Sequence, residues 1–542
     1  MRHVGAVVVA MVVAGVVVMT GVALAQAPQP APKAAARAGA LQTRPERTNF
    51  DNTSTYEDVV AFMQAAAKAS PKIHLTTFGY TTEGRPLPLA VIGAPAATPE
   101  AVRATGKLRV HIQGNIHGGE VEGKESAQIL LRELAQGKHA DWLQSMVLII
   151  APIYNADGNE RFSLTNRGRQ HGPIGGQGQR PNAQGFDLNR DHMKLDSPEA
   201  RSFARLLTDY DPHVSMDLHT TNGTRHAYHL TYSPPLNPAT DPAILDFLRN
   251  EWLPAVTKTV KSKYGWDYYY YSNLTGQSNT PGARDERAWR SFDHRPRFNN
   301  NYVGLRNRIA ILSEAYAYST FQERITATSR FIAEVVSYAH KHAARIKQIT
   351  EAADSRKIVG TQVSLRADMF RAPELIEVLL GEVTTEKHPV DGHAMEKRVD
   401  VRKPERVADY SQFKATETER VPSTYYLPPA LAVALERLSA HGVRMTALTA
   451  PETVQVEEFQ IAGSEAAERE FQGHRERTLT GKWVAAERQL PAGTLRVDMT
   501  QPLARLAFYL IEPRSDDGLV DWNLLDDAIG ISKVYPIVRA RR

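Results

Sequence analysis

The sequence predicts an α/β fold, with a mixed, mainly parallel central sheet flanked by helices and followed by a strand-rich accessory region. Three observations support this prediction. Short apolar runs alternate with helical patterns between residues 50 and 350, as expected for strands joined by crossover helices. These runs are almost continuously apolar, which indicates strands buried on both faces. Beyond about residue 356, strand-like runs are broken by Pro, Gly and Asp, a pattern typical of strands joined by turns.

The expected elements follow in a regular order. A capping-box pattern, Ser54-Thr-Tyr-Glu57, precedes apolar residues with helical spacing and predicts the first helix. Ser197-Pro198-Glu199 predicts another helix start, because Ser is a favoured N-cap and Pro fits the first turn. The expected strands cover residues 73–80, 87–92, 107–113, 146–153, 213–219 and 308–314, and the expected helices cover 122–137, 197–208, 240–262, 320–350 and 428–441.

The chain of 542 residues is long enough for two to four domains. We expect a signal peptide (1–25), a flexible Pro/Ala-rich linker (26–47), an α/β domain (48–355) and an accessory region (356–542). The net charge of +5 without a long basic block argues against a nucleic-acid partner. The absence of Cys excludes disulfides, a thiolate nucleophile and Cys-type metal sites.

The N-terminus predicts export. Arg2 and His3 precede an apolar run over residues 4–24, and Ala23-Leu24-Ala25 has the form of a signal-peptidase site. A membrane anchor is the alternative, because the run nears the length that spans a bilayer. The polar Pro/Ala-rich sequence that follows favours cleavage. We therefore expect a periplasmic or secreted protein without a stable membrane anchor.

Polar residues at the ends of two expected strands form a candidate metal site. His117 and Glu120 follow strand 107–113, and His219 ends strand 213–219. Ligands in such sheets bind beyond the carboxyl ends of the strands, and a His2Glu set leaves one zinc position open for water. Taken alone, His117 and Glu120 could equally be a solvated loop. Glu122 and Glu125, on the following helix, are expected to face solvent, and Glu122 is the alternative ligand if Glu120 points away.

Glu314 ends the last expected strand, inside an apolar sequence. A carboxylate there is costly unless it has a specific partner, so it is the candidate general base for a zinc-bound water. The alternative is an ion pair with Arg306 or Arg308.

Two polar segments supply candidate substrate contacts. Arg190 could bind a carboxylate bidentately with help from Asn189, and Asp187 could accept the second N–H of a ligating His. Arg167 and Arg169 lie in a Gly-rich segment and either could stabilise a developing oxyanion. The alternative for each arginine is a solvated loop charge.

Taken in order, these motifs resemble those of the zinc metallocarboxypeptidase family (carboxypeptidases A and B), in a large exported bacterial type with a C-terminal accessory region. The matching residues are His117-x-x-Glu120, Asn155-x-Asp157-Gly158, Asn166-Arg167, Asp187-x-Asn189-Arg190, His219 and Glu314. The resemblance implies one Zn²⁺ per chain, held by His117, Glu120 and His219, with Glu314 as base. It also implies that Asn189 and Arg190 bind the free C-terminal carboxylate of a peptide, that Asp187 supports His117, and that an Arg polarises the scissile carbonyl.

The sequence departs from the family pattern at two places. At the position where the family has its carbonyl-polarising Arg, this sequence has Gln170. Arg169 lies one residue before that position. The family's mobile substrate-binding Tyr is missing from residues 288–294, and Tyr302 or one of Tyr268 to Tyr271 is expected to replace it. A Tyr run is more often sheet or core packing.

The preferred hypothesis is an exported zinc metallocarboxypeptidase. One alternative is a zinc amidohydrolase of the same frame that acts on cell-wall peptides or N-acyl amino acids, and another is a non-catalytic binding protein. The side-chain pocket is expected between residues 289 and 305, where Arg290, Arg295, Arg297 and Asn299 to Asn301 favour polar or acidic substrate side chains.

Overall fold

The computed structural model describes residues 41–540, except 222, 276–285 and 531. The chain divides into residues 1–40 and residues 41–542, and the description concerns the second unit. The predicted signal peptide and most of the predicted linker therefore lie outside the described residues. Among the described residues, no helix combines the length and apolarity needed to span a membrane.

The last residues of the predicted linker form structure instead of a flexible segment. Helix α2 (Arg44–Arg47) begins with a capping box in which Thr43 and Glu46 exchange hydrogen bonds. Arg132 from a later helix pairs with Glu46 at 2.6 Å and donates to the carbonyl of Leu41. The prediction of a linker up to residue 47 is therefore wrong for residues 41–47, because the capping box fixes this turn against the domain.

An eight-stranded sheet with the order β1-β2-β4-β3-β5-β10-β6-β7 forms the centre of the α/β domain. Its strands are β1 (Ile73–Tyr80), β2 (Pro86–Ile92), β3 (Leu108–Gly114), β4 (Met146–Ala151), β5 (Val214–Thr220), β6 (Leu230–Ser233), β7 (Tyr268–Tyr270) and β10 (Ile309–Ala315). The neighbours β4/β3, β3/β5, β5/β10 and β6/β7 are parallel, and the other three pairs are antiparallel. The prediction of a mixed, mainly parallel sheet is confirmed.

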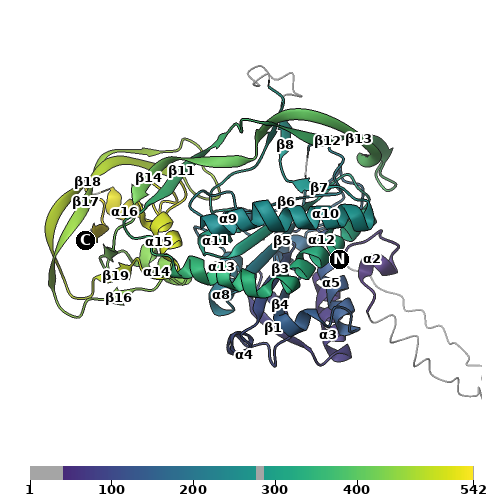
Figure 1. Ribbon diagram of the computed structural model, residues 1–542, viewed down its shortest axis with the longest axis horizontal. Helices are drawn as coiled ribbons and strands as arrows, with labels where there is room; N and C mark the ends of the chain where they lie inside the picture. Colours follow the sequence, from purple (N-terminus) through teal and green to yellow (C-terminus); the bar gives the residue numbers. More distant parts are fainter. Residues whose placement is uncertain (1–40, 222, 276–285, 531, 541–542) are drawn as a thin grey trace, which may run out of the picture. The chain divides into compact units, whose positions relative to one another are not determined.

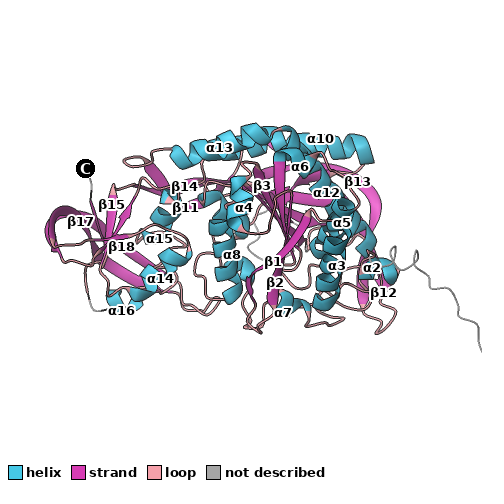
Figure 2. Cartoon of the chain, turned by 90° about the horizontal axis from the view of Figure 1, so that it is seen from below, coloured by secondary structure: helices cyan, strands magenta, loops and turns pink. Residues whose placement is uncertain are grey.

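Helices cover both faces of this sheet (Figure 2). The longer ones are α3 (Tyr56–Ala69), α5 (Glu122–Ala135), α8 (Pro198–Asp209), α10 (Leu253–Tyr264), α12 (Phe321–Lys341) and α13 (Ala343–Ser355). The shorter ones are α4 (Pro99–Ala104), α6 (Trp142–Ser145), α7 (Ala156–Asn159), α9 (Pro242–Phe247) and α11 (Asn299–Leu305). The expected helix 240–262 is α9 and α10 joined by a π-helical turn, Leu248–Trp252, and the expected helix 320–350 breaks at His342.

Alternate residues of the strands enter two different hydrophobic clusters. Met146, Leu148 and Ile150 pack with α3, α5 and α12, whereas Val147 and Ile149 pack with α8. This alternation follows from the two-residue period of a strand. The cluster on the α8 side continues into the accessory region, so the two predicted domains share one core.

The accessory region is rich in antiparallel strands, as predicted. Strand β11 (Gln362–Phe370) pairs with β14 (Gln412–Arg420), and β12 (Leu375–Lys387) pairs with β13 (Ala394–Tyr410). Strand β13 also joins β9 (Ala288–Arg290) and, through it, β8 (Asn273–Thr275) of the α/β domain.

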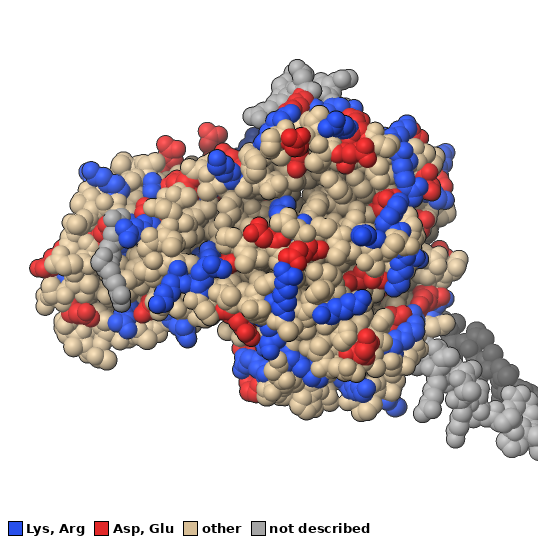
Figure 3. All heavy atoms as spheres, in the orientation of Figure 1, with Lys and Arg blue, Asp and Glu red and all other residues tan. Residues whose placement is uncertain are grey.

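A six-stranded sheet completes this region. Its strands are β15 (Thr424–Leu427), β16 (Thr446–Ala447), β17 (Glu452–Ala466), β18 (Arg477–Leu490), β19 (Leu495–Asp498) and β20 (Val538–Ala540). The helices α14 (Ala432–Ala440), α15 (Ala504–Ile511) and α16 (Asp526–Ile529) accompany it. On the face shown in Figure 3, acidic and basic side chains are interspersed.

Candidate metal centre

Two neighbouring parallel strands and one loop bring the candidate metal ligands together. Glu314 on β10 is the direct register partner of His219 on β5, and the loop after β3 carries His117 and Glu120. The side chains of His117, Glu120 and His219 are buried, and one ligand atom from each lies within 4.8 Å of the others. The sequence therefore predicted a convergence that the structure has.

The loop between His117 and Glu120 requires its two glycines. A Cβ at Gly118 would lie 2.3 Å from the carbonyl carbon of Gly158, and a Cβ at Gly119 would lie 2.4 Å from the carbonyl oxygen of Gly178. The close approach of these neighbouring chains fixes the loop and the two side chains that it carries.

Both histidines are oriented by carboxylates at their Nε2 atoms. Nε2 of His117 lies 3.0 Å from Asp187 Oδ1, and Nε2 of His219 lies 2.8 Å from Asp217 Oδ2. This arrangement leaves the two Nδ1 atoms facing Glu120, at 2.9 Å and 3.0 Å from its oxygens. Asp187, which the sequence predicted as a support for a ligating His, lies within hydrogen-bond distance of His117. Asp217 was missed, although its position two residues before His219 places both on one face of β5.

The donor set fits a zinc ion. Two nitrogen lone pairs and one carboxylate converge in a buried place, and Nδ1 of His117, although 2.9 Å from Glu120, makes no well-aligned hydrogen bond among the described residues. Zinc takes this His2Glu set in catalytic sites, and carboxylates behind ligating histidines are the usual support.

The surroundings of the carboxylates shift their pKa values in opposite directions. Burial alone would raise the pKa of Asp187, but His117 and Arg180 hold it well below its usual range. Burial and the nearby Glu120 carboxylate raise the pKa of Glu314 to about 8. A divalent cation held by His117, Glu120 and His219 would oppose this rise and favour the ionised form.

The structure separates the arginines of the Gly-rich segment. Arg167 contacts Glu120, but the side chain of Arg169 is 64% exposed and pairs with Glu396, away from the cluster. The prediction that Arg169 could act at the site is therefore wrong. Arg180 was missed: it bonds Asp187 at 2.9 Å and approaches Glu120 at 3.6 Å. It lies in the segment that was singled out, but no spacing rule distinguishes it there.

The candidate carboxylate clamp follows Asp187 in a short 3-10 turn, Leu188–Arg190. The guanidinium of Arg190 lies over the Phe298 ring, 3.8 Å from its centroid, and donates to the carbonyl of Asn189 at 2.7 Å. The side-chain oxygen of Asn189 accepts a hydrogen bond from the backbone N–H of Asn299 at 2.8 Å. This bond links the 3-10 turn to the start of α11.

One cavity of about 140 Å³ joins these groups. Its lining includes the candidate ligands, clamp and base, together with apolar and aromatic residues, as follows: His117, Glu120, Arg180, Asn189, Arg190, His219, Thr220, Tyr271, Phe292, Phe298, Leu312 and Glu314. A site that combines a metal, a cation for a carboxylate and a base can hydrolyse a bond next to a terminal carboxylate.

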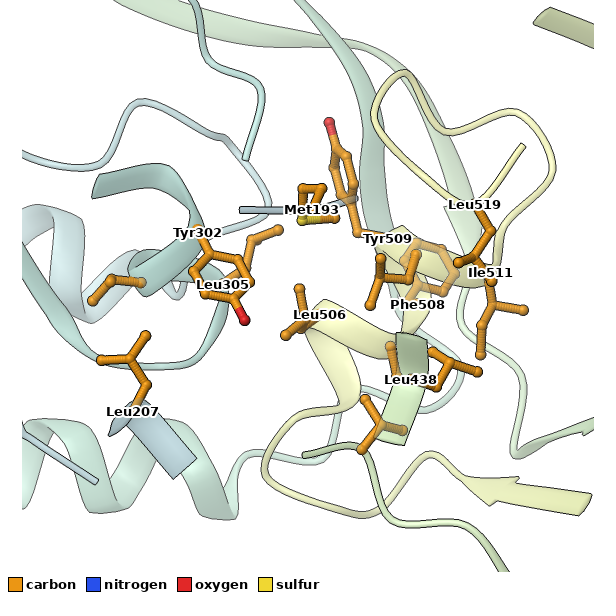
Figure 4. Packing of buried hydrophobic residues seen from close by; sticks show 14 of the residues in the cluster. Met193, Leu207, Tyr302, Leu305, Leu438, Leu506, Phe508, Tyr509, Ile511 and Leu519 are labelled. Atoms are coloured by element: carbon orange, nitrogen blue, oxygen red, sulfur yellow. The ribbon is translucent and has the colours of Figure 1, made fainter. Parts of the chain in front are cut away.

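Tyr302 does not lie at this cavity. Tyr302 belongs to α11 and its side chain is fully buried. Its hydroxyl lies 2.8 Å from Nδ1 of His441 in the accessory region. The prediction that Tyr302 binds substrate is therefore wrong. Helix α11 packs against the accessory region, and Tyr302 lies in the hydrophobic core between them (Figure 4). Tyr271, from the Tyr run, lines the cavity instead.

The expected polar lining of the side-chain pocket is also wrong. Arg290 stacks on Tyr410, Arg295 pairs with Asp293, and Arg297 is buried against Asp517. The asparagines 299 to 301 hydrogen bond within the protein, and Phe292, Phe298 and Leu312 line the cavity. Glu122 and Glu125 are buried rather than solvent-facing, paired with Arg324 and with Thr53 and Ser54.

Comparisons with known proteins agree with this geometry. Residues 59–222 match a family model described as zinc carboxypeptidase. This range includes His117, Glu120 and His219, and it ends before Glu314. Carboxypeptidase 2 of Trichophyton tonsurans is 24% identical over 501 residues, which cover 89% of this chain and 86% of that protein.

Two further similarities are more limited. Carboxypeptidase D of Mus musculus is 34% identical over 146 residues, which cover 24% of this chain and 10% of that protein. The solved structure of a metallo-carboxypeptidase from Burkholderia cenocepacia has 16% sequence identity and a TM-score of 0.40, and the match covers 54% of this chain and 70% of that one.

Proposed function

We propose that this chain is a zinc metallocarboxypeptidase whose substrates are peptides with a free C-terminal carboxylate, a function supported by the family match and by the cluster of His117, Glu120 and His219. The observation that supports this substrate best is the shared cavity, which Arg190 lines together with His117, Glu120 and His219. A guanidinium in such a place is a favourable partner for a carboxylate.

We assign one zinc ion per chain to Nδ1 of His117, Nδ1 of His219 and the carboxylate of Glu120. Zinc bound there supplies a Lewis acid for a carbonyl and lowers the pKa of a water molecule. Asp187 and Asp217 keep both imidazoles in the tautomer that this role requires.

Glu314 is the proposed general base. Its Oε2 is buried and has no hydrogen-bond partner among the described residues, so it can accept the proton of the attacking water. The same carboxyl then passes that proton to the leaving amine nitrogen. The alternative of an ion pair with Arg306 or Arg308 does not apply, since those residues bond Tyr302 and Asp211.

Arg180 is the proposed partner of the developing oxyanion. It lines the cavity that holds Glu314 and Arg190, whereas Arg167 and Arg169 line a neighbouring cavity. A fixed cation in a water-excluding site stabilises charge that develops in the transition state. The signal-peptide pattern predicted over residues 1–25 supports a periplasmic or secreted location.

The test uses a peptide, its C-terminal amide and an N-acyl amino acid, with products identified by mass. We expect single C-terminal residues to be released from the free-acid peptide, activity to stop with a chelator, and zinc to restore it. Arg190→Ala is expected to raise KM for the free acid about tenfold or more. Preferred cleavage of the amide, or no zinc-dependent release at all, would contradict the proposal.

A further inference from the structure

Two segments of the accessory region, residues 471–476 and residues 516–521, contact residues that support the candidate site from outside its cavity. We propose that these two segments position the carboxylate-binding end of the site, with Gln472 and Asp517 as the positioning residues. This inference rests on the proposed function, because it concerns Asp187 and Arg190. Neither Gln472 nor Asp517 touches the cavity, so both act through other residues.

Gln472 lies in the loop between β17 and β18. Its side-chain oxygen accepts the backbone N–H of Asp187 at 2.8 Å. Asp187 is the residue that holds Nε2 of His117 and Nε of Arg180. The side chain of Gln472 therefore fixes the backbone of Asp187. The Asp187 carboxylate in turn orients the metal ligand His117 and the proposed oxyanion partner Arg180.

The surrounding contacts keep this loop in place. His474 lies 2.7 Å from Asp196, which also pairs with the buried Lys194 at 2.9 Å. The ring of Phe471 stacks on that of Trp522, at 6.2 Å between centroids. Gln472 itself has a φ of +52°, a conformation that is unfavourable for a non-glycine residue. A strained residue in a packed loop indicates a position that the surrounding structure holds.

The second segment holds the residues that precede α11. Asp517 accepts Nε of Arg297 at 2.8 Å and also its backbone N–H. The guanidinium of Arg297 makes further pairs with Asp521 at 3.0 Å and Glu476 at 2.7 Å. Both Asp517 and Arg297 are almost completely buried, so this network sets the position of the loop that carries Phe298.

Phe298 is the link to the clamp. The Arg190 guanidinium lies over its ring, and the nearest carboxylate oxygen of Asp187 is 4.0 Å away. A stacked arginine without a tight ion pair keeps its donors available for a substrate carboxylate. The direction of those donors then depends on Phe298 from one side and on the turn after Asp187 from the other. The accessory region supports both sides.

The packing between the two regions is rigid enough to transmit this support. Tyr302 and Leu305 of α11 lie in one hydrophobic cluster with Leu506, Phe508 and Tyr509 of α15 (Figure 4). Close-packed interiors move little on average. Helix α11 begins one residue after Phe298, so the shared core fixes the same loop from its other end.

The experiment uses the full chain with Gln472→Met, which keeps the size of the side chain and removes the acceptor. Gln472→Glu is the rescue variant, because it retains an acceptor oxygen. Gln455→Met is the matched control: Gln455 is an exposed residue of the same strand pair, bonded to Glu487. For each variant, KM and kcat are measured on a free-acid peptide, and the rate of zinc release is measured with a chelator.

We expect Gln472→Met to raise KM about threefold to tenfold and to speed zinc release by a similar factor, with kcat within about twofold of wild type. Gln472→Glu and Gln455→Met should stay within about twofold of wild type in all three quantities. Wild-type KM and zinc release in Gln472→Met would overturn the proposal, as would equal effects in Gln455→Met or no rescue by Gln472→Glu.

Two features keep this test independent of the proposed function. Zinc release can be measured even if the wild-type protein fails to cleave peptides, a result that would contradict the proposed substrate and not the positioning by Gln472. Asp517 is fully buried, so its replacement tests folding together with position, and the decision rests on the Gln472 variants.

Discussion

At the scale of single residues, Glu314 differs from the other carboxylates around the cavity. Glu120 faces both histidines, and Asp187 and Asp217 each hold a histidine. Oε2 of Glu314 has no partner among the described residues, and burial raises its pKa. A carboxylate held without a neutralising partner in a buried cavity is suited to proton transfer.

Glu314→Gln should therefore keep one zinc per chain and lower kcat by about 10²–10⁴-fold, the usual contribution of a general base. Zinc content and steady-state kinetics check this expectation. Glu133→Gln, a change at a surface carboxylate that pairs with Lys138, is the control and should leave kcat unchanged. Wild-type turnover by Glu314→Gln would remove Glu314 from the mechanism.

The two arginines that the structure separates give a second prediction. Arg180→Met should lower kcat by about 10²-fold, because a fixed donor to the oxyanion is lost. Arg169→Met is the matched control, since the Arg169 side chain is exposed and points to Glu396. Zinc content is measured in parallel, as Arg180 also bonds Asp187. If Arg169→Met had the larger effect on kcat, the assignment would be reversed.

The residues that were predictable from the sequence share one property. His117, Glu120, His219 and Glu314 each lie at or just after the end of an apolar strand, so the sheet alone brings them together. Arg180 could not be found in this way. It lies in an irregular polar segment, and the spacing of apolar residues does not predict the path of such a segment. Tyr302 was misplaced because its burial depends on a contact with His441 in the accessory region.

At the scale of secondary-structure elements, the register of β5 and β10 fixes the position of Glu314. The pairing Glu314↔His219 follows from Ile309↔Val214 at the start of the two strands, and both strands were predicted within one residue. The divided helices were not predictable to the same degree. The π turn before α10 and the break at His342 depend on local backbone geometry that apolar spacing does not reveal.

A buried ion pair joins α5 and α12 and gives a prediction about stability. Arg324 of α12 bonds Glu122 at the start of α5, and both side chains are fully enclosed. Glu122→Ala leaves Arg324 buried without its carboxylate, which should lower the free energy of unfolding by about 3–5 kcal/mol. Urea unfolding monitored by fluorescence measures this difference.

The exposed pair of Arg345 with Glu251 is the control for this measurement. Glu251→Ala should lower the free energy of unfolding by no more than about 1 kcal/mol, because solvent screens exposed pairs. Equal losses in the two variants would show that burial does not decide the strength of the Glu122 contact.

At the scale of the whole molecule, the α/β domain and the accessory region share a core. The sequence predicted a boundary near residue 356 and an accessory region packed against the α/β domain, but it did not indicate which residues join the two. The hydrophobic cluster around Tyr302 and Leu506 joins residues about two hundred positions apart (Figure 4), and such pairings have no signature in local periodicity. Stability of the two parts should therefore be coupled, and a buried histidine at their junction reports on it.

His441 is fully buried after α14, between the hydroxyl of Tyr302 at 2.8 Å and the carbonyl of Met193 at 3.1 Å. Burial and nearby cations lower the pKa of His441 to about 3. The unfolded chain binds the proton at a pKa of about 6.5. The folded state therefore excludes a proton that the unfolded state accepts, and stability falls as the pH drops below about 6.5. Linkage gives a loss of about 2 kcal/mol between pH 7 and pH 5 from this residue.

The measurement compares urea unfolding of wild type and His441→Gln at pH 7 and pH 5. Glutamine can accept from Tyr302 and donate to Met193 without titrating, so the variant should lose about 2 kcal/mol less between the two pH values. Every other group is the same in the two proteins, so its contribution to the pH dependence cancels in the difference between them. An identical pH dependence in the two proteins would mean that His441 is accessible to protons in the folded state, and that the junction between the two regions opens at pH 5.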